Sequence, residues 1–172
     1  MSFASLAERF PDLYPKIISI QNSYSLLVRK DYEAGLTEVC SPRNHNVGLL
    51  AYSPLCGGML TAKYSKQSPD IEKTRLNLFP GFMSRYKDSQ PERAVAAYEK
   101  IANKHQLTPA QLALSWCYHR NCVASTIIGA TSITQLEENL QAFDVKLGEE
   151  VLEEIDDVYK EFVDSTKAYN KK

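Results

Sequence analysis

Residues 47 to 64 read VGLLAYSPLCGGMLTAKY, and this stretch decides how the rest of the chain is read. The apolar run from 47 to 51 is typical of a buried strand, and it is followed by Tyr52, a Ser-Pro turn and the pair Gly57-Gly58. Such an ending suits a flat, phosphorylated cofactor, because the ring can stack and glycine lets backbone N–H groups approach phosphate. The same pattern is also typical of a strand that ends in an ordinary turn. At this point both interpretations stay open.

The composition is that of a globular domain rather than a disordered or membrane-bound chain. The 172 residues are 44% hydrophobic and 24% charged, close to globular averages. Lys and Arg number 20 against 21 Asp and Glu, and this balance argues against a general nucleic-acid or membrane-surface binder. No apolar run reaches the ~18 residues of a membrane span. The first ten residues, MSFASLAERF, lack the apolar segment of a signal peptide.

Cysteine and histidine spacing gives no indication of a metal site. The four cysteines are Cys40, Cys56, Cys117 and Cys122. They form no CxxC pair, and no histidine stands at zinc-finger spacing from them, so we expect free thiols in a reducing compartment. The three histidines also lack the spacing of metal ligands or of a catalytic triad. We therefore predict no metal.

Hydrophobic periodicity predicts alternating helices and strands along the chain. The helices are expected at 2–9, 31–40, 91–105, 109–119, 132–142 and 149–163, and the strands at 16–20, 47–51 and 123–128. The clearest helix start is at Thr108, where Pro109 and Gln111 complete a capping box. Between 65 and 90 the periodicity disappears, but aromatic residues remain, which favours a functional loop.

This alternation indicates parallel βαβ units in an α/β fold. A parallel sheet needs both faces and both edges covered, and three strands are few for that purpose. The chain is therefore either a small open α/β sandwich or part of a larger fold. The polar residues from 165 to 172 are expected to form a tail.

Ligands of α/β folds bind beyond the carboxyl ends of the strands, which predicts where a site would lie. The residues there are Gln21, Asn22 and Tyr24, the segment 52–58, and the segment 129–132. The last segment opens a helix whose N-terminus attracts anions, and Thr131 or Ser132 can cap it. Lys63 and Arg85 are candidate phosphate partners.

One helix face after the third strand carries polar residues three and four positions apart. They are Gln135, Glu138 and Asn139. A face of this kind usually means a solvated surface. If it points at an adenosine, the same amides and carboxylate recognise base and ribose instead.

Four segments together resemble the aldo/keto reductases. They are QNSYSLLVR (21–29), LLAYSPLCGGMLTAKY (49–64), RLNLFPGFMSRY (75–86) and STIIGATSITQLEENLQAF (125–143). The resemblance is to the branch shared by plant and bacterial NADPH-dependent reductases and potassium-channel beta subunits. It implies part of a (β/α)8 barrel, or TIM barrel, that binds NADP(H) as cofactor and reduces aldehydes or ketones by hydride transfer.

The resemblance also implies a role for each candidate residue in cofactor binding. At the nicotinamide end, Gln21 would hold the carboxamide and Tyr52 would stack on the ring. The pyrophosphate would be lined by Ser53, Leu55 and Gly57, with Lys63 nearby and Arg85 in a loop that closes over the cofactor. Gly129 and Thr131 would meet the 2′-phosphoribose, and the adenosine end would be met by Gln135, Glu138 and Asn139.

The resemblance covers residues 1–164 as the C-terminal half of the family's domain, with strands six to eight and their helices. A full barrel takes about 250 residues. The family's catalytic Asp, Tyr, Lys and His belong to the other half, so the resemblance implies no catalytic residue in this chain. Two alternatives remain, a non-catalytic nucleotide-binding or interaction module and a truncated remnant. The expected partners are NADPH and either a complementary N-terminal half or a second copy. The expected location is the cytoplasm or a plastid.

Overall fold

A computed structural model describes residues 3–61, 79, 86, 89–163 and 165–166. In chain order the elements are α1 (Phe3–Arg9), β1 (Ser19–Ser23), α2 (Lys30–Glu33), α3 (Leu36–Cys40), β2 (Gly48–Tyr52), the 3-10 helix η1 (Cys56–Gly58), α5 (Ser89–Lys104), α6 (Pro109–Tyr118), β3 (Val123–Ile127), α7 (Ile133–Gln141) and α8 (Glu149–Glu161). The fold is mixed α/β with a small parallel sheet, as the alternating pattern predicts. Most of the expected loop at 65–90 lies outside the described residues.

The sheet has the order β1-β2-β3, and both pairs are parallel. Neighbours in the β1–β2 register include Gln21 beside Leu50 and Ser23 beside Tyr52. The β2–β3 register shifts between Leu49 and Leu50, so Ala124 is an extra residue in β3. A Cβ on Gly48 would stand 2.6 Å from the Cβ of Ala124, closer than side chains pack, so glycine is required beside the bulge.

The two faces of the sheet have different surroundings. Leu49 and Ala51 of β2 are fully buried, at 0% exposure, and pack with the helices in one core that includes Leu112 and Trp116 of α6. The alternating residue of β2, Leu50, is half-buried, and Ile127 of β3 is 43% exposed. We call the face that includes Leu49 the closed face and the face that includes Leu50 the open face.

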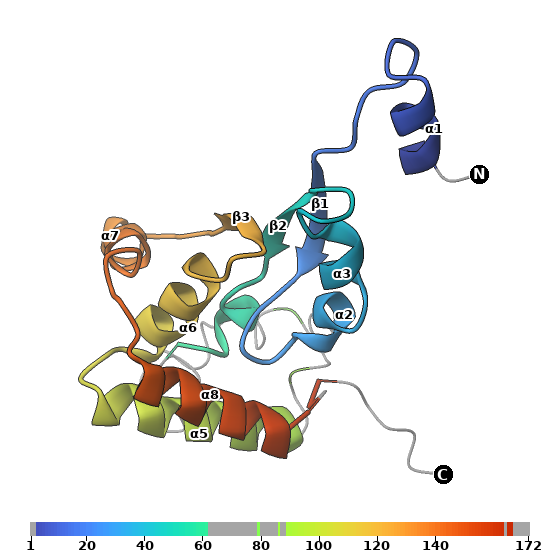
Figure 1. Cartoon of the computed structure of the whole chain (residues 1–172). Coiled ribbons are helices and arrows are strands. Elements are labelled where there is room, and N and C mark those ends of the chain that lie inside the picture. Colours follow the sequence, from blue (N-terminus) through green and yellow to red (C-terminus); the bar gives the residue numbers. More distant parts are fainter. Residues whose placement is uncertain (1–2, 62–78, 80–85, 87–88, 164, 167–172) are drawn as a thin grey trace.

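The helices gather on the closed face. Figure 1 shows α5 and α8 side by side below the sheet, α6 between the strands and this helix pair, α7 beyond the end of β3, and α2 with α3 next to β1. The N-terminal α1 stands apart from them, beyond the start of β1. A hydrogen bond of 2.7 Å joins Oε1 of its Glu8 to Nδ1 of His45, which follows α3.

Two predicted elements differ from the structure, and both differences have a physical cause. The first strand begins at Ser19 instead of residue 16, because pairing with β2 begins where the Gly48 N–H donates to the Ile18 carbonyl, at 2.9 Å. Ile18 itself is 74% exposed. The helix predicted at 31–40 is divided into α2 and α3, because Gly35 adopts a φ of +154° between them.

The capping box predicted at the start of α6 is confirmed. The Thr108 hydroxyl accepts the Gln111 N–H at 3.1 Å, and the Gln111 side chain accepts the Thr108 N–H at 3.0 Å. Pro109 occupies the first turn, where a missing N–H costs nothing. At the other end of the chain, Ser165 and Thr166 of the expected polar tail are buried.

Candidate functional site

The carboxyl ends of all three strands lie at one edge of the sheet, and the candidate residues gather there. Gln21 is exposed on the open face of β1, and Tyr52 is the half-buried last residue of β2 on the same face. Gln21 lies within β1 rather than after it, because the strand is displaced along the sequence. The structure therefore brings the two predicted nicotinamide contacts onto one face of neighbouring strands.

A buried hydroxyl lies on the same face, beside Tyr52 in the sheet and two residues after Gln21. Ser23 is 3% exposed and pairs with Tyr52, and its Oγ has no hydrogen-bond partner within the described ranges. Such orphaned polar atoms are uncommon, because burial without a partner is costly. Gln21 offers an amide, Tyr52 a ring and Ser23 a hydroxyl. An amide, a ring and a hydroxyl on one face can together contact a flat, polar ligand.

The segment from Ser53 to Gly58 turns sharply after β2. Positive φ values occur at Ser53 (56°), Cys56 (52°), Gly57 (69°) and Gly58 (100°). For Ser53 and Cys56 this conformation costs about 1–2 kcal/mol each, because Cβ approaches the following carbonyl oxygen. Strain of this kind clusters at binding sites. It was invisible in the sequence, where only the glycines indicated a turn.

The amides of this segment are only partly available to a ligand. The Cys56 N–H donates to the Ser53 carbonyl at 3.0 Å, and the Gly58 N–H donates to the Leu55 carbonyl at 2.9 Å. The turn therefore uses the Gly58 N–H itself. Leu55 is half-buried against the core.

Two hydrogen bonds tie this segment to the end of β1. The Tyr24 N–H donates to the Tyr52 carbonyl at 3.3 Å, and a hydrogen bond of 3.0 Å joins Ser25 Oγ to Cys56 Sγ. Ser25 and Cys56 are both fully buried. Sequence reasoning missed Ser25, because its partner is 31 residues away.

The loop between β3 and α7 is held by the helix that follows it. Ser132 caps α7 by accepting the Gln135 N–H at 3.3 Å, as predicted. Gln135 Oε1 accepts the N–H and the hydroxyl of Thr131, at 3.0 and 3.1 Å. Asn139 is 3% exposed, and its side-chain amide donates to the Gly129 carbonyl at 3.4 Å. Gln135 and Asn139 thus contact both residues predicted at the 2′-phosphoribose.

Glu138 has a different neighbour from the other two. Its carboxylate accepts the Thr108 hydroxyl at 2.7 Å, at the start of α6. The three polar residues lie within about one turn of α7. Glu138 joins α7 to the start of α6. Gln135 and Asn139 join α7 to the loop after β3. The candidates Lys63 and Arg85 lie outside the described residues.

One cluster of potential metal ligands occurs within the described ranges, away from the sheet edge. Ligand atoms of His105, Glu150 and Glu154 all lie within 4.8 Å of one another. Lys104 Nζ, however, contacts both carboxylates, at 2.7 Å for Glu150 and 2.6 Å for Glu154. This ammonium already offsets part of the charge of the acidic pair, and hydrogen bonds from Lys104 and His105 lower the pKa of Glu154.

Comparison with known proteins identifies the family of this chain. The model of the aldo/keto reductase family matches residues 4–160, which is most of the chain. The chain belongs to the aldo/keto reductase family. The resemblance seen in the four sequence segments is therefore confirmed.

The relatives of this aldo/keto reductase chain are longer than the chain itself. It is 44% identical to Protein tas of Escherichia coli over 160 residues, which cover 93% of this chain and 44% of that protein. It is 41% identical to an aldo-keto reductase of Babesia bovis, with coverage of 76% and 46%. A probable voltage-gated potassium channel subunit beta of Arabidopsis thaliana is 34% identical, with coverage of 78% and 40%. The chain thus spans less than half the length of these relatives.

The described residues form α-helices of 4 to 16 residues. None of the helices in these residues combines the length and the apolar character that crossing a bilayer needs.

Proposed function

We propose that this chain is the NADP(H)-binding portion of an aldo/keto reductase whose intact form reduces aldehydes or ketones by hydride transfer. The observation that carries the proposal is the group formed by Gln21, Ser23 and Tyr52 at one edge of the sheet. Family membership supports the reductase class, and the buried, unsatisfied Ser23 hydroxyl supports a polar ligand at this edge.

In this proposal each region of the site binds one part of the cofactor. Gln21 donates to and accepts from the nicotinamide carboxamide, and the Tyr52 ring stacks on the nicotinamide. Ser53, Leu55 and Gly57 line the pyrophosphate, with Lys63 and Arg85 supplying positive charge. Gly129 and Thr131 meet the 2′-phosphoribose, and Gln135, Glu138 and Asn139 bound the adenosine end. NADPH supplies the hydride when it is bound.

The α7 N-terminus suits the phosphate end of the cofactor. The first amides of a helix have no partners within the helix, and the dipole favours negative charge there. Gln135 and Asn139 act here chiefly by holding the loop from Gly129 to Thr131 in a fixed arrangement beside this helix N-terminus.

We further propose that β1, β2 and β3 correspond to strands six to eight of a (β/α)8 barrel. The open face would then line the barrel interior, and it would be covered by a complementary N-terminal half or, in its absence, by a second copy. The half-exposed apolar residues of the open face support this proposal, because exposed apolar patches and unpaired strand edges favour association. The family's proton-donating residues would come from that other half.

Thermal unfolding of the 172-residue chain with and without NADPH tests the cofactor assignment. A ligand that binds only the folded state stabilises it by RT ln(1 + [L]/Kd), or about 2.7 kcal/mol at 100 times Kd. For a chain of this size we expect a rise of roughly 5–10 °C in the midpoint. NADH serves as the comparison, because it lacks the 2′-phosphate that Gly129 and Thr131 would meet.

Two variants of one residue make the test specific. Tyr52→Ala removes the stacking ring and is expected to reduce the NADPH shift, whereas Tyr52→Phe keeps the ring and should retain most of it. A midpoint that does not move with NADPH would contradict cofactor binding by this chain alone. If the chain also oxidises NADPH with generic aldehydes above background, the proposal that the proton donor lies in another half is wrong.

A further inference from the structure

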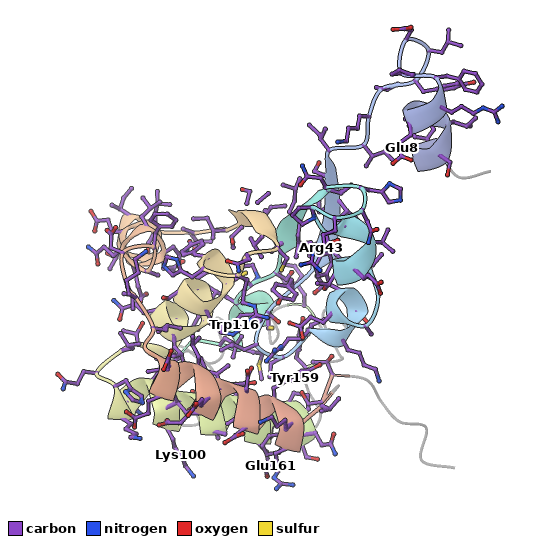
Figure 2. The ribbon with its side chains drawn as sticks, viewed as in Figure 1. Glu8, Arg43, Lys100, Trp116, Tyr159 and Glu161 are labelled. Carbon is purple, nitrogen blue, oxygen red and sulfur yellow. The ribbon has the colours of Figure 1, made fainter. Side chains whose placement is uncertain are left out.

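A buried arginine is linked to the candidate cofactor site through Glu33 and Tyr24, and sequence reasoning gave it no role. Arg29 is 7% exposed and stands at the end of the segment that joins β1 to α2. Its guanidinium carbon lies 4.2 Å from the centre of the Tyr159 ring and 5.1 Å from that of Trp116. Figure 2 labels both residues, Trp116 on α6 and Tyr159 on α8. Arginine is seldom this buried without partners.

The guanidinium joins two carboxylates from different helices. Its Nε donates to both carboxylate oxygens of Glu33, at 3.1 and 3.2 Å, and its Nη1 donates to Asp156 at 2.7 Å. Burial alone lowers the pKa of Arg29, but the Asp156 hydrogen bond and the Glu33 charge outweigh it and raise the pKa. The side chain is therefore charged and points in one direction, because its planar fork must meet both acids at once.

Glu33 connects Arg29 to Tyr24, the first residue after β1. The Tyr24 hydroxyl donates to Glu33 at 2.6 Å, and its ring stacks on Trp116 with the centroids 5.2 Å apart. Burial and the Glu33 hydrogen bond raise the pKa of Tyr24, so the hydroxyl remains a donor. The backbone of the same residue donates to Tyr52, the proposed stacking residue.

We propose that Arg29 is a positioning residue of the cofactor site, acting through Glu33 and Tyr24. It holds the segment 24–29, and this segment in turn fixes Tyr52 and the strained turn 53–58 through the Tyr24 N–H and the Ser25–Cys56 hydrogen bond. The role in cofactor binding rests on the proposed function, whereas the mechanical coupling does not.

An apolar side chain would fill the space between the two rings, so packing alone does not require an arginine here. Replacing a whole buried ion pair by apolar groups of similar volume is often neutral for stability, whereas removing one partner leaves an uncompensated charge and is costly. A guanidinium instead fixes the position of the Glu33 carboxylate, which must accept the hydrogen bond of the Tyr24 hydroxyl. Loss of that fixed position should loosen the 52–58 segment more than it lowers the overall stability.

Hydrogen exchange of the 172-residue chain, read by mass spectrometry over residues 52–58, tests the coupling without any ligand. Arg29→Met and Arg29→Lys should each accelerate exchange there by about tenfold, and Tyr24→Phe by about threefold, as expected for the loss of one or two hydrogen bonds. Ile155→Val is the control, because Ile155 is fully buried on α8 beside Asp156 but belongs to no part of this network. Exchange is compared after correction for each variant's free energy of unfolding.

NADPH affinity provides the second measurement. The Kd should rise by about tenfold in the Arg29 variants and stay within twofold in Ile155→Val, because only the former release the Tyr52 segment. Trp116 is the single tryptophan of the chain and stacks on Tyr24, so its fluorescence reports the same change.

The outcomes separate the two proposals. If the native chain binds no NADPH, the proposed function fails, and the exchange experiment still decides whether Arg29 positions the turn. Unchanged exchange at 52–58 in the Arg29 variants would overturn the inference and leave Arg29 as a contact that only docks α8. If an Arg29 variant does not fold, Tyr24→Phe carries the test, since it removes a single hydroxyl.

Discussion

The two faces of the β1-β2-β3 sheet are made by alternate residues of the same strands, yet they differ in how far their side chains are exposed to solvent. On the closed face Leu49 and Ala51 are fully buried under the helices. On the open face Leu50 is half-buried, and Gln21 and Ile127 are exposed. Within the described residues the core therefore lies on one side of the sheet, and the candidate residues Gln21 and Tyr52 lie on the other side, where Ser23 is the buried exception.

The largest difference is expected between two neighbouring leucines on opposite faces. Leu49→Ala should lower the free energy of unfolding by about 2–5 kcal/mol, because it leaves a cavity in the packed core. Leu50→Ala should cost less than half as much, because its side chain is already partly in solvent. Urea unfolding of both variants measures the difference. Equal losses would mean that the open face is covered in solution, for instance by a second copy.

Gly48 tests whether every position of the open face tolerates a change of side-chain size. Gly48→Ala places a Cβ where it meets the Cβ of Ala124 at 2.6 Å, and we expect a loss of about 1–3 kcal/mol from overpacking. The double variant Gly48→Ala, Ala124→Gly removes the clash and should recover most of the loss. Recovery that fails in urea unfolding would show that the constraint at Gly48 is not its contact with the bulge.

The helices that cover the closed face also depend on local contacts. Thr108→Ala removes the cap of α6 and should cost about 1 kcal/mol. Gln111→Ala keeps the Thr108 hydroxyl and its bond to Glu138, so it should cost less. Circular dichroism during urea unfolding gives both values. If Gln111→Ala lowers the free energy of unfolding as much as Thr108→Ala, the Thr108 hydroxyl contributes nothing beyond its part in the capping box.

The smallest expected effect is the loss of stability at alkaline pH from the buried Cys117 thiol of α6. Burial raises the pKa of the Cys117 thiol from 9.0 to about 11. A raised folded-state pKa means that the neutral thiol is favoured in the core, so its contribution is complete below pH 9 and is lost as the pH rises toward 11. At pH 9.5 the loss is below about 1 kcal/mol.

Thermal midpoints of the native chain and of Cys117→Ala between pH 8 and 10 isolate this contribution. Both proteins should lose stability, because burial also raises the pKa values of Tyr24 and Tyr98. The native chain should lose more. Parallel curves would mean that water reaches the Cys117 thiol in the folded state.

Much of the fold was readable from the sequence because it depends on neighbours along the chain. The α6 capping box, the Ser132 cap and the amphipathic α5 and α8 are local patterns of three to sixteen residues, and all are present. The displaced β1 shows the limit of this reasoning. The β-branched residues at 17 and 18 favour a strand, but pairing with β2 decides where the strand begins.

The candidate site shows the same division. The sequence indicated the three strand ends and the residues around them, through turn signals and through motifs of the aldo/keto reductases. It did not indicate that Ser23 has an orphaned hydroxyl, that Ser53 and Cys56 are strained, or that Gln135 and Asn139 hold the β3 loop. Each of these depends on atoms that meet only after the elements pack.

Local patterns in the sequence were enough to predict the main helices and strands, the caps of α6 and α7 and the family to which the chain belongs, because these depend on residues close together in the chain. The register of the sheet, the choice of closed and open face, and the pairing of Arg29 with Asp156, 127 residues away, became visible only in the folded structure. Contacts between distant residues depend on how whole elements pack, and no local pattern contains that information.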